Sequence, residues 1–173
     1  GSGKSSLLHC LAGVIVPDEG SVFVEGVDLT GLSDRERSRL RLERMGVVFQ
    51  FGDLVPELTL VENVMLPLQL LGRRTAQSRR RALELLDLLG VADLADARTG
   101  AVSGGQAQRA AVARAMVHEP RIVLADEPTG SLDSINAEAV LDALVGLTRH
   151  AGATLLVVTH DNIVASHLDT LVT

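Results

Sequence analysis

Apolar runs of strand length recur along the chain, and each is followed by polar residues. Ile122–Ala125 is too apolar for a strand that faces water, and Met45–Phe49 and Thr154–Val158 share this character. Continuous apolar runs of this kind are typical of strands buried on both faces of a parallel sheet. A fourth segment, Ser21–Val24, alternates as a short strand that is broken by Gly26.

Helical periodicity fills the spaces between these strands. The predicted helices are Ser5–Ala12, Ser33–Arg44, Arg79–Leu89, Gln106–His118 and Ile135–His150. Ser33 is expected to cap its helix, with Glu36 at the third helical position, and Pro120 to stop the fourth helix. Strand–helix alternation at both ends of the chain predicts an α/β fold with a mostly parallel sheet. The segment from 51 to 118 is predicted to be an inserted α-helical subdomain.

Composition and charge fit a single soluble domain. The chain has 173 residues, of which 46% are hydrophobic and 22% charged, and a net charge of −6 that disfavours nucleic acid as the main partner. No apolar run approaches the ~18 residues of a membrane span, so we expect any membrane role to come through a partner protein. The chain opens on Gly-Ser-Gly-Lys rather than on a signal peptide. The single cysteine, Cys10, excludes an internal disulfide and is expected to be buried.

The first candidate site is a glycine-rich turn at the start of the first predicted helix. It contains the only lysine among 16 basic residues and has the sequence Gly1, Ser2, Gly3, Lys4, Ser5, Ser6. Glycines let backbone amides surround phosphate oxygens, and the helix that follows presents unpaired N–H groups to the same anion. Lys4 would reach the β- and γ-phosphates, and the Ser5 hydroxyl would bind Mg²⁺. The alternative is a flexible glycine–serine start, because the first glycine of the full phosphate-loop pattern is not in the chain.

The second candidate site is a pair of acids at the end of the Ile122–Ala125 strand. In open parallel sheets, ligands bind at the edge formed by the carboxyl ends of the strands. Asp126 is placed to hold Mg²⁺ beside the phosphates, and Glu127 to act as general base on the water that attacks the γ-phosphate. The alternative is a solvated strand end.

A third motif identifies a family. Val102-Ser103-Gly104-Gly105-Gln106 closely resembles the LSGGQ signature of ATP-binding cassette (ABC) ATPases, and Gln108-Arg109 and Ala113-Arg114-Ala115 continue that pattern. The phosphate loop, the acid pair and Thr159-His160-Asp161 follow the order of the family. The resemblance implies a phosphate-loop ATPase with a RecA-like catalytic core, at 1–50 and 119–173, and a helical signature subdomain at 51–118.

The resemblance also implies roles for single residues. In the family, Ser103, Gly104, Gly105 and Gln106 would reach across a head-to-tail dimer to the γ-phosphate held by a second ABC domain, and a homodimer is expected. Gln50 matches the glutamine of the Q-loop, which touches Mg²⁺ or the attacking water. His160 matches the switch histidine, expected to bind the γ-phosphate and to hold the attacking water with Glu127. Asp133 corresponds to the aspartate that couples the two sites. The implied cofactors are ATP and Mg²⁺.

A finer resemblance concerns the partner. Val47-Val48-Phe49-Gln50-Phe51 and Leu54-Val55-Pro56-Glu57-Leu58-Thr59 look like the lipoprotein-release and macrolide-export branch of ABC ATPases. The implied partner is an integral membrane permease, with the ATPase peripheral on the cytoplasmic face of the inner membrane. Leu54, Val55, Leu58 and Leu60 are candidates for the groove that holds a permease helix, although core packing explains at least half of them equally well.

Two departures and two alternatives complete the sequence-based interpretation. The strand pair and the adenine-stacking aromatic residue that open the family's domain do not precede Gly1, so we expect an N-terminally truncated cassette. Ser6 stands where the family has threonine. A non-transport ABC ATPase of the DNA-repair or translation type is the alternative function, although the chain shows none of the insertions typical of that class. The arginines at 73, 74, 79, 80 and 81 are interpreted as a solvated, partly ion-paired helix face rather than a membrane-surface patch, since Glu84 follows Arg80 by four residues.

Overall fold

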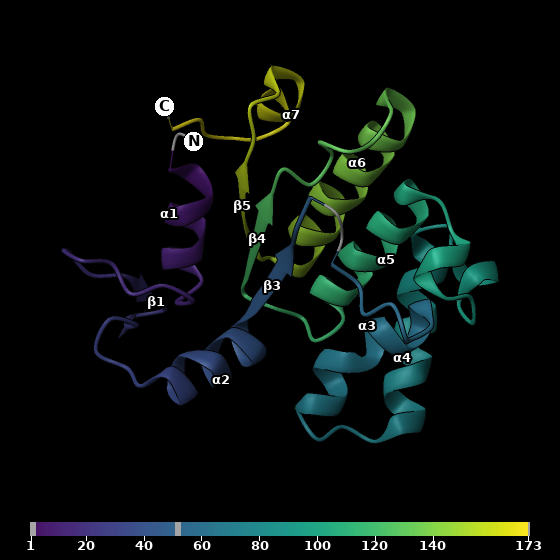
Figure 1. Ribbon diagram of the computed structural model, residues 1–173, viewed down its shortest axis with the longest axis horizontal. Coiled ribbons are helices and arrows are strands. Elements are labelled where there is room, and N and C mark those ends of the chain that lie inside the picture. The colour runs from purple at the N-terminus through teal and green to yellow at the C-terminus, as the bar shows by residue number, and fades with distance from the viewer. Residues whose placement is uncertain (1–2, 51–52, 173) are drawn as a thin grey trace.

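The computed structural model of the chain describes residues 3–50 and 53–172. Five short strands alternate with helices in this part of the chain (Figure 1). The strands are β1 (Phe23–Val24), β2 (Val27–Asp28), β3 (Met45–Val48), β4 (Ile122–Asp126) and β5 (Thr154–Val158). The helices are α1 (Lys4–Leu11), α2 (Asp34–Arg44), α3 (Leu60–Leu70), α4 (Thr75–Leu88), α5 (Gly104–Met116), α6 (Ser134–Ala151) and α7 (Asn162–Ser166), with single 3₁₀ turns η1 (Ala92–Leu94) and η2 (Thr99–Ala101).

The central sheet is parallel, in the order β3–β4–β5. Val48 is paired with Ala125, and Asp126 with Val158, so the three strands end at one edge. The predicted α/β class is confirmed. The three apolar runs are all strands, although β3 stops one residue before Phe49 and β4 extends to Asp126.

The predicted strand Ser21–Val24 is shorter than expected and forms half of a small hairpin. Only Phe23–Val24 is extended, and it pairs with Val27–Asp28. Glu25 and Gly26 join the two strands with φ angles of 49° and 81°. Two central residues with positive φ are typical of the tight turns that match the twist of a hairpin.

Helix caps explain where several helices begin. The predicted cap of α2 is confirmed, because Ser33 accepts a hydrogen bond from the Glu36 amide while the Glu36 carboxylate accepts one from the Ser33 amide. Thr59 and Glu62 form the same capping box at the start of α3, a helix that the sequence analysis missed. The helix expected at Arg79–Leu89 begins earlier, at Thr75. The helix expected at Gln106–His118 runs from Gly104 to Met116, so it ends several residues before Pro120.

Helices cover both faces of the sheet (Figure 1). Helix α1 packs against β4 and β5 on one face, while α5 contacts β3 and α6, and α6 contacts β5, on the other. Helices α3 and α4 pack on the far side of α5. One hydrophobic cluster joins these helices to the sheet, and a second lies beneath α1 and the hairpin. Because every element between β3 and β4 is helical, the structure suits the expected helical insertion, but its boundaries at 51 and 118 stay a prediction.

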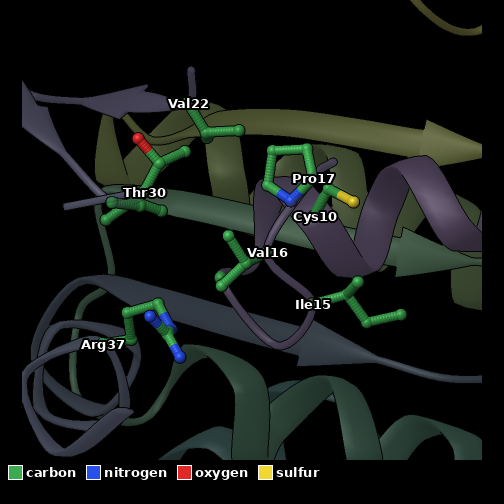
Figure 2. A pocket seen from close by; sticks show the side chains of 9 residues that line it. Cys10, Ile15, Val16, Pro17, Val22, Thr30 and Arg37 are labelled. Atoms are coloured by element: carbon green, nitrogen blue, oxygen red, sulfur yellow. The ribbon is translucent and has the colours of Figure 1, made fainter. Parts of the chain in front are cut away.

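Two smaller expectations have different outcomes. Cys10 was expected to be buried, but it is half-buried, because it lies at the edge of α1 and lines a narrow hollow with Pro17 and Val22 (Figure 2). Arg79, Arg80 and Arg81 lie on α4, and the predicted ion pairing is confirmed for them, with Arg80 3.8 Å and Arg81 3.4 Å from Glu84. The arginines at 73 and 74 precede the helix.

Candidate functional site

The candidate catalytic residues lie together where the three parallel strands end. Gln50 follows β3, Asp126 ends β4, Glu127 comes directly after it, and His160 follows β5. The register of the sheet puts these positions at a single edge, because Asp126 pairs with Val158 and the Glu127 amide donates to the Val158 carbonyl at 2.8 Å. The parallel topology therefore collects residues that are more than 100 positions apart in the sequence into one site.

Glu127 is held in place by two side chains from the end of β5. Its Oε1 lies 2.7 Å from Nδ1 of His160, and its Oε2 accepts a hydrogen bond from the Thr159 hydroxyl at 3.2 Å. The Glu127 side chain is 20% exposed and that of His160 77% exposed. A carboxylate can accept about four hydrogen bonds, so Glu127 keeps acceptor capacity for a further donor such as water.

The backbone at Glu127 is in the left-handed region, with a φ of 45°. The Gly130 amide donates back to the Glu127 carbonyl at 3.0 Å and closes a tight turn directly after the strand. A residue other than glycine is uncommon in this conformation, which is concentrated at functional sites. The turn redirects the chain at the point where the carboxylate is presented.

Asp126 has a feature that suits a cation. Its Oδ1 is buried and has no hydrogen-bond partner among the residues that the structure describes. A buried carboxylate oxygen without a partner is costly, and a bound cation would compensate for it. In the described part of the chain no three His, Cys, Asp or Glu side chains gather as a metal cage. Mg²⁺ does not need such a cage, because it is usually held by one or two carboxylates together with substrate phosphates.

Gln50 reaches toward the turn that follows Glu127. A Cβ built on Gly130 would lie 3.0 Å from Nε2 of Gln50 and 3.5 Å from Cβ of Glu127. The Ser131 hydroxyl donates to the Gln50 carbonyl at 3.0 Å. The segment after β3 and the segment after β4 are thus in direct contact, and a side chain at position 130 would require the Gln50 amide to shift.

The described part of the candidate phosphate loop begins α1. Gly1 and Ser2 lie outside the described residues. Gly3 is the N-cap of α1 with a left-handed φ of 74°, and Lys4, Ser5 and Ser6 form the exposed first turn. A helix start of this kind presents its unpaired N–H groups to solvent or to an anion. Contacts of α1 with β4 and β5 keep this helix beside the strands that carry Asp126 and His160.

The signature residues form a second cluster at the start of α5. Ser103 and Gln106 make a capping box, in which the Ser103 amide donates to the Gln106 side chain at 2.8 Å. Gly105 is buried against α6, since a Cβ on it would lie 2.7 Å from Oδ1 of Asn136. Asn136 is in turn bound by Asp133, which caps α6 and accepts from the Asn136 side chain at 2.7 Å.

The Asp133 carboxylate has a lowered pKa, because it accepts hydrogen bonds from the backbone and the side chain of Asn136. The predicted signature turn and Asp133, the aspartate predicted to couple the two sites, are therefore parts of one junction, with Asn136 between them.

Sequence reasoning assigned no role to Gln108, Thr159 or Asn136. Gln108 is 2% exposed and donates to two backbone carbonyls beside the site. Asn136 fills the space beside Gly105. Nothing in the composition or periodicity around these residues singles them out. Gln108 belongs to the Gln108-Arg109 pair that follows the signature, and Thr159 to Thr159-His160-Asp161. Membership of these motifs was the only sequence feature that could have indicated a role for them.

The groove residues named from sequence divide between core and surface. Leu60 is fully buried, Leu54 and Leu58 are half-buried, and Val55 is 37% exposed. Leu60 therefore belongs to the core. Within the described residues, none of the helices has the length and apolar character needed to cross a membrane.

Comparison with known proteins places these features in context. The family model described as "ABC transporter" matches residues 1–130. The lipoprotein-releasing system ATP-binding protein LolD of Xanthomonas oryzae pv. oryzae is 44% identical over 169 residues, which is 98% of this chain and 69% of that protein. LolD of Hyphomonas neptunium is 39% identical over 173 residues, covering 100% of this chain and 76% of the relative.

A solved structure agrees with these relatives. The dimeric post-hydrolysis state of the ATP-binding cassette MJ0796, bound to ADP and Pi, superimposes with a TM-score of 0.87 at 40% sequence identity. The match covers 95% of this chain and 72% of that one.

Proposed function

Because this chain belongs to the ABC transporter family, we propose that the edge formed by β3, β4 and β5 is the hydrolytic half of a shared ATP site. The family makes the chain an ATP-binding domain whose ATP hydrolysis is coupled to transport. The non-transport alternative is not favoured by these relatives. The observation that carries the assignment of the site is the contact of Glu127 with His160 and Thr159 beside the unpartnered Asp126 oxygen.

In this proposal Glu127 is the general base and His160 its positioning partner. Glu127 accepts the proton of the attacking water, and His160 and Thr159 fix the direction of the carboxylate. The His160 ring uses Nδ1 toward Glu127, which leaves Nε2 for the terminal phosphate.

The binding half of the proposed site lies at the start of α1. Lys4 binds the β- and γ-phosphates, and the amides and hydroxyls at the start of the helix complete the cradle. Asp126, Ser5 and Gln50 are the residues that would hold Mg²⁺. When bound, Mg²⁺ would neutralise charge that develops on the phosphate oxygens.

The signature turn is proposed to act on a second copy of the domain. Ser103, Gly104 and Gly105 open α5 and would direct its first amides to the γ-phosphate held by the partner domain. The MJ0796 cassette, which this chain resembles, is a dimer in its solved structure, and this supports pairing of the same kind. Asp133, joined to the signature through Asn136, would meet the same partner.

The proposed partner in the membrane is a permease of the lipoprotein-release or macrolide-export type. The support is the similarity to LolD proteins, whose name assigns them to a lipoprotein-releasing system. The chain would then act at the cytoplasmic face of the inner membrane. Co-purification of the full-length protein with a permease tests this, whereas recovery with DNA or ribosomes would contradict it.

The shared site has a complementation test in the full-length protein. Lys4→Ala removes the phosphate contact of one half-site, and Ser103→Arg blocks the other. Each variant alone should fail to form a MgATP-dependent dimer in a Glu127→Gln background, measured by size-exclusion chromatography. A mixture should form dimers, because one site of the mixed dimer keeps both intact halves. If the mixture behaves like the separate variants, the two halves do not belong to different subunits.

A further inference from the structure

Gln108 lies one turn into α5 and is almost completely buried, with 2% of its surface exposed. Its side-chain Nε2 donates to the Phe49 carbonyl at 2.8 Å and to the Pro128 carbonyl at 2.8 Å. Both hydrogens of the amide are thus used, and both acceptors are backbone groups from outside the helix. A buried glutamine that bonds two distant segments is a specific connection rather than a filler of space.

The two carbonyls that accept these bonds belong to neighbours of Gln50 and Glu127 in the sequence. Phe49 directly precedes Gln50, and Pro128 directly follows Glu127. β3 ends at Val48 and β4 at Asp126, so both carbonyls lie just beyond the last residues of the sheet. Gln108 therefore donates hydrogen bonds to the backbone just beyond the ends of β3 and β4, where the ladder of the sheet no longer does so. These two segments carry the Gln50 and Glu127 side chains.

The same helix also holds the chain beyond Gln50. Arg114 donates from Nη1 to the Asp53 carbonyl at 2.8 Å. Helix α5 is thus bonded to the backbone before Gln50, after Gln50 and after Glu127. Because α5 begins with the signature turn, any shift of that turn along or about the helix axis reaches these three points directly.

We propose that Gln108 is a positioning residue that fixes the Gln50 and Glu127 backbones relative to each other and to the signature helix. The proposal rests on the function proposed above for Gln50 and Glu127. Loss of the amide would remove a hydrogen bond from each of two carbonyls at the site, and the bond to the Pro128 carbonyl is buried. The strand exits would then be free to move, and misplacement of a reacting group by ~1 Å can cost ~10²-fold in rate.

The test compares Gln108→Met with Val112→Ala in the full-length protein. Met keeps the length of the side chain and lacks the donor. Val112 is fully buried one turn further along α5, and its truncation controls for a general loss of packing. We expect Gln108→Met to lower kcat by ~10- to 10²-fold with KM for ATP nearly unchanged. Val112→Ala should lower the thermal midpoint and keep kcat within ~3-fold of wild type.

A structural readout separates this proposal from that for the site. The amides of Gly130 and Leu132 donate within the turn after Glu127, to the carbonyls of Glu127 and Thr129. Their hydrogen exchange should accelerate in Gln108→Met and not in Val112→Ala. This arm does not depend on turnover, so it still decides the positioning role if Glu127→Gln proves active and the proposed catalytic role fails.

A second variant tests the donor itself. Gln108→Glu conserves shape but puts an acceptor opposite two carbonyls when ionised, and it supplies one donor when protonated. Its kcat relative to wild type should therefore rise as the pH falls. Equal kcat and equal exchange in Gln108→Met and Val112→Ala, or a flat pH ratio for Gln108→Glu, would overturn the proposal.

Discussion

Nδ1 of His160 lies 2.7 Å from Oε1 of Glu127, joining two residues that are 33 positions apart in the sequence and follow adjacent strands. The contact exists because β4 and β5 run parallel and in register up to Asp126 and Val158. It orients the carboxylate from the side, so the direction of Glu127 depends on the position of β5 as well as on its own strand.

The first prediction concerns Glu127→Gln. The amide keeps the size of the side chain and can accept from Thr159, but it cannot take a proton from water. We expect ATP hydrolysis by the full-length protein to fall ~10²–10⁴-fold while MgATP binding is retained, as measured by phosphate release and equilibrium binding. Wild-type turnover in this variant would remove Glu127 from the role of base.

The second prediction compares two glycines in different surroundings. A Cβ at Gly46, in β3, would collide with the backbone carbonyl oxygen of Ala115 on α5, whereas a Cβ at Gly146, inside α6, would meet nothing within 4 Å. Gly46→Ala should destabilise the fold by ~1–3 kcal/mol or more, because backbone must move. Gly146→Ala should stabilise it by ~0.4–1 kcal/mol, because alanine favours the helix.

Chemical denaturation of both variants measures these changes in the free energy of unfolding. Equal stability of the two would show that α5 is not as close to β3 as the structure has it.

The third prediction tests the junction between the signature and α6. Gly105→Ala would place a methyl group 2.7 Å from Oδ1 and 3.1 Å from Cβ of Asn136, and Asn136 is held by Asp133. Gly104→Ala would meet only Leu132, at 3.8 Å. We expect Gly105→Ala to lower the free energy of unfolding by ~1–3 kcal/mol and Gly104→Ala to leave it nearly unchanged. Thermal unfolding at a fixed pH checks this; a larger loss for Gly104→Ala would contradict the packing described.

The fourth prediction is a pH dependence that comes from His118. Burial lowers the pKa of His118 below its ordinary 6.5, and a hydrogen bond to the Met45 carbonyl only partly offsets this. Nε2 donates that bond at 3.0 Å, so the second proton would go to Nδ1, which is buried without a partner among the described residues and shares a pocket with Arg114.

Below about pH 6.5 the unfolded chain therefore takes up a proton more readily than the folded one. The stability that His118 contributes is present above that pH and is lost as the pH falls through the folded-state pKa. His118→Gln keeps a donor and does not titrate. Its thermal midpoint should fall less than that of wild type between about pH 7.5 and pH 5.5.

Glu36 and Glu62 titrate outside the pH range of this measurement. The pKa values of Glu36 and Glu62 are lowered from 4.5 by their capping hydrogen bonds, so their contributions are lost at more acidic pH. Identical pH responses of wild type and His118→Gln would contradict a buried, neutral His118.

The parallel sheet could be predicted because each of its three strands is a continuous apolar run in the sequence. The strands Met45–Val48 and Ile122–Asp126 are mostly buried, and Thr154–Val158 is half-buried. Asp126 ends its strand, Glu127 follows it, and His160 comes two residues after Val158. Once strands of this kind are placed in parallel, their ends must meet at one edge. The gathering of Glu127 and His160 is therefore readable from the sequence.

Helix α3 could not be read in the same way. Pro67 lies inside Leu60–Leu70 and interrupts the helical pattern of the sequence. The capping box of Thr59 and Glu62 was nevertheless a sequence signal for the start of this helix. The connections of Gln108 and Asn136 were equally hidden. The Phe49 carbonyl bound by Gln108 is distant in sequence. Asn136 meets Gly105 only because α5 and α6 pack against each other. No local sequence pattern encodes either contact.

Under the proposed catalytic role, the left-handed backbone of Glu127 makes stability and turnover depend in opposite ways on one residue. A non-glycine residue held at a φ of 45° costs on the order of 1–2 kcal/mol, and the fold tolerates this through the bonds of Glu127 to Val158 and Gly130. Glycine here would relax the chain and delete the carboxylate in the same step. If Glu127 is the general base proposed above, a screen for heat-resistant variants alone would therefore select an inactive protein at residue 127.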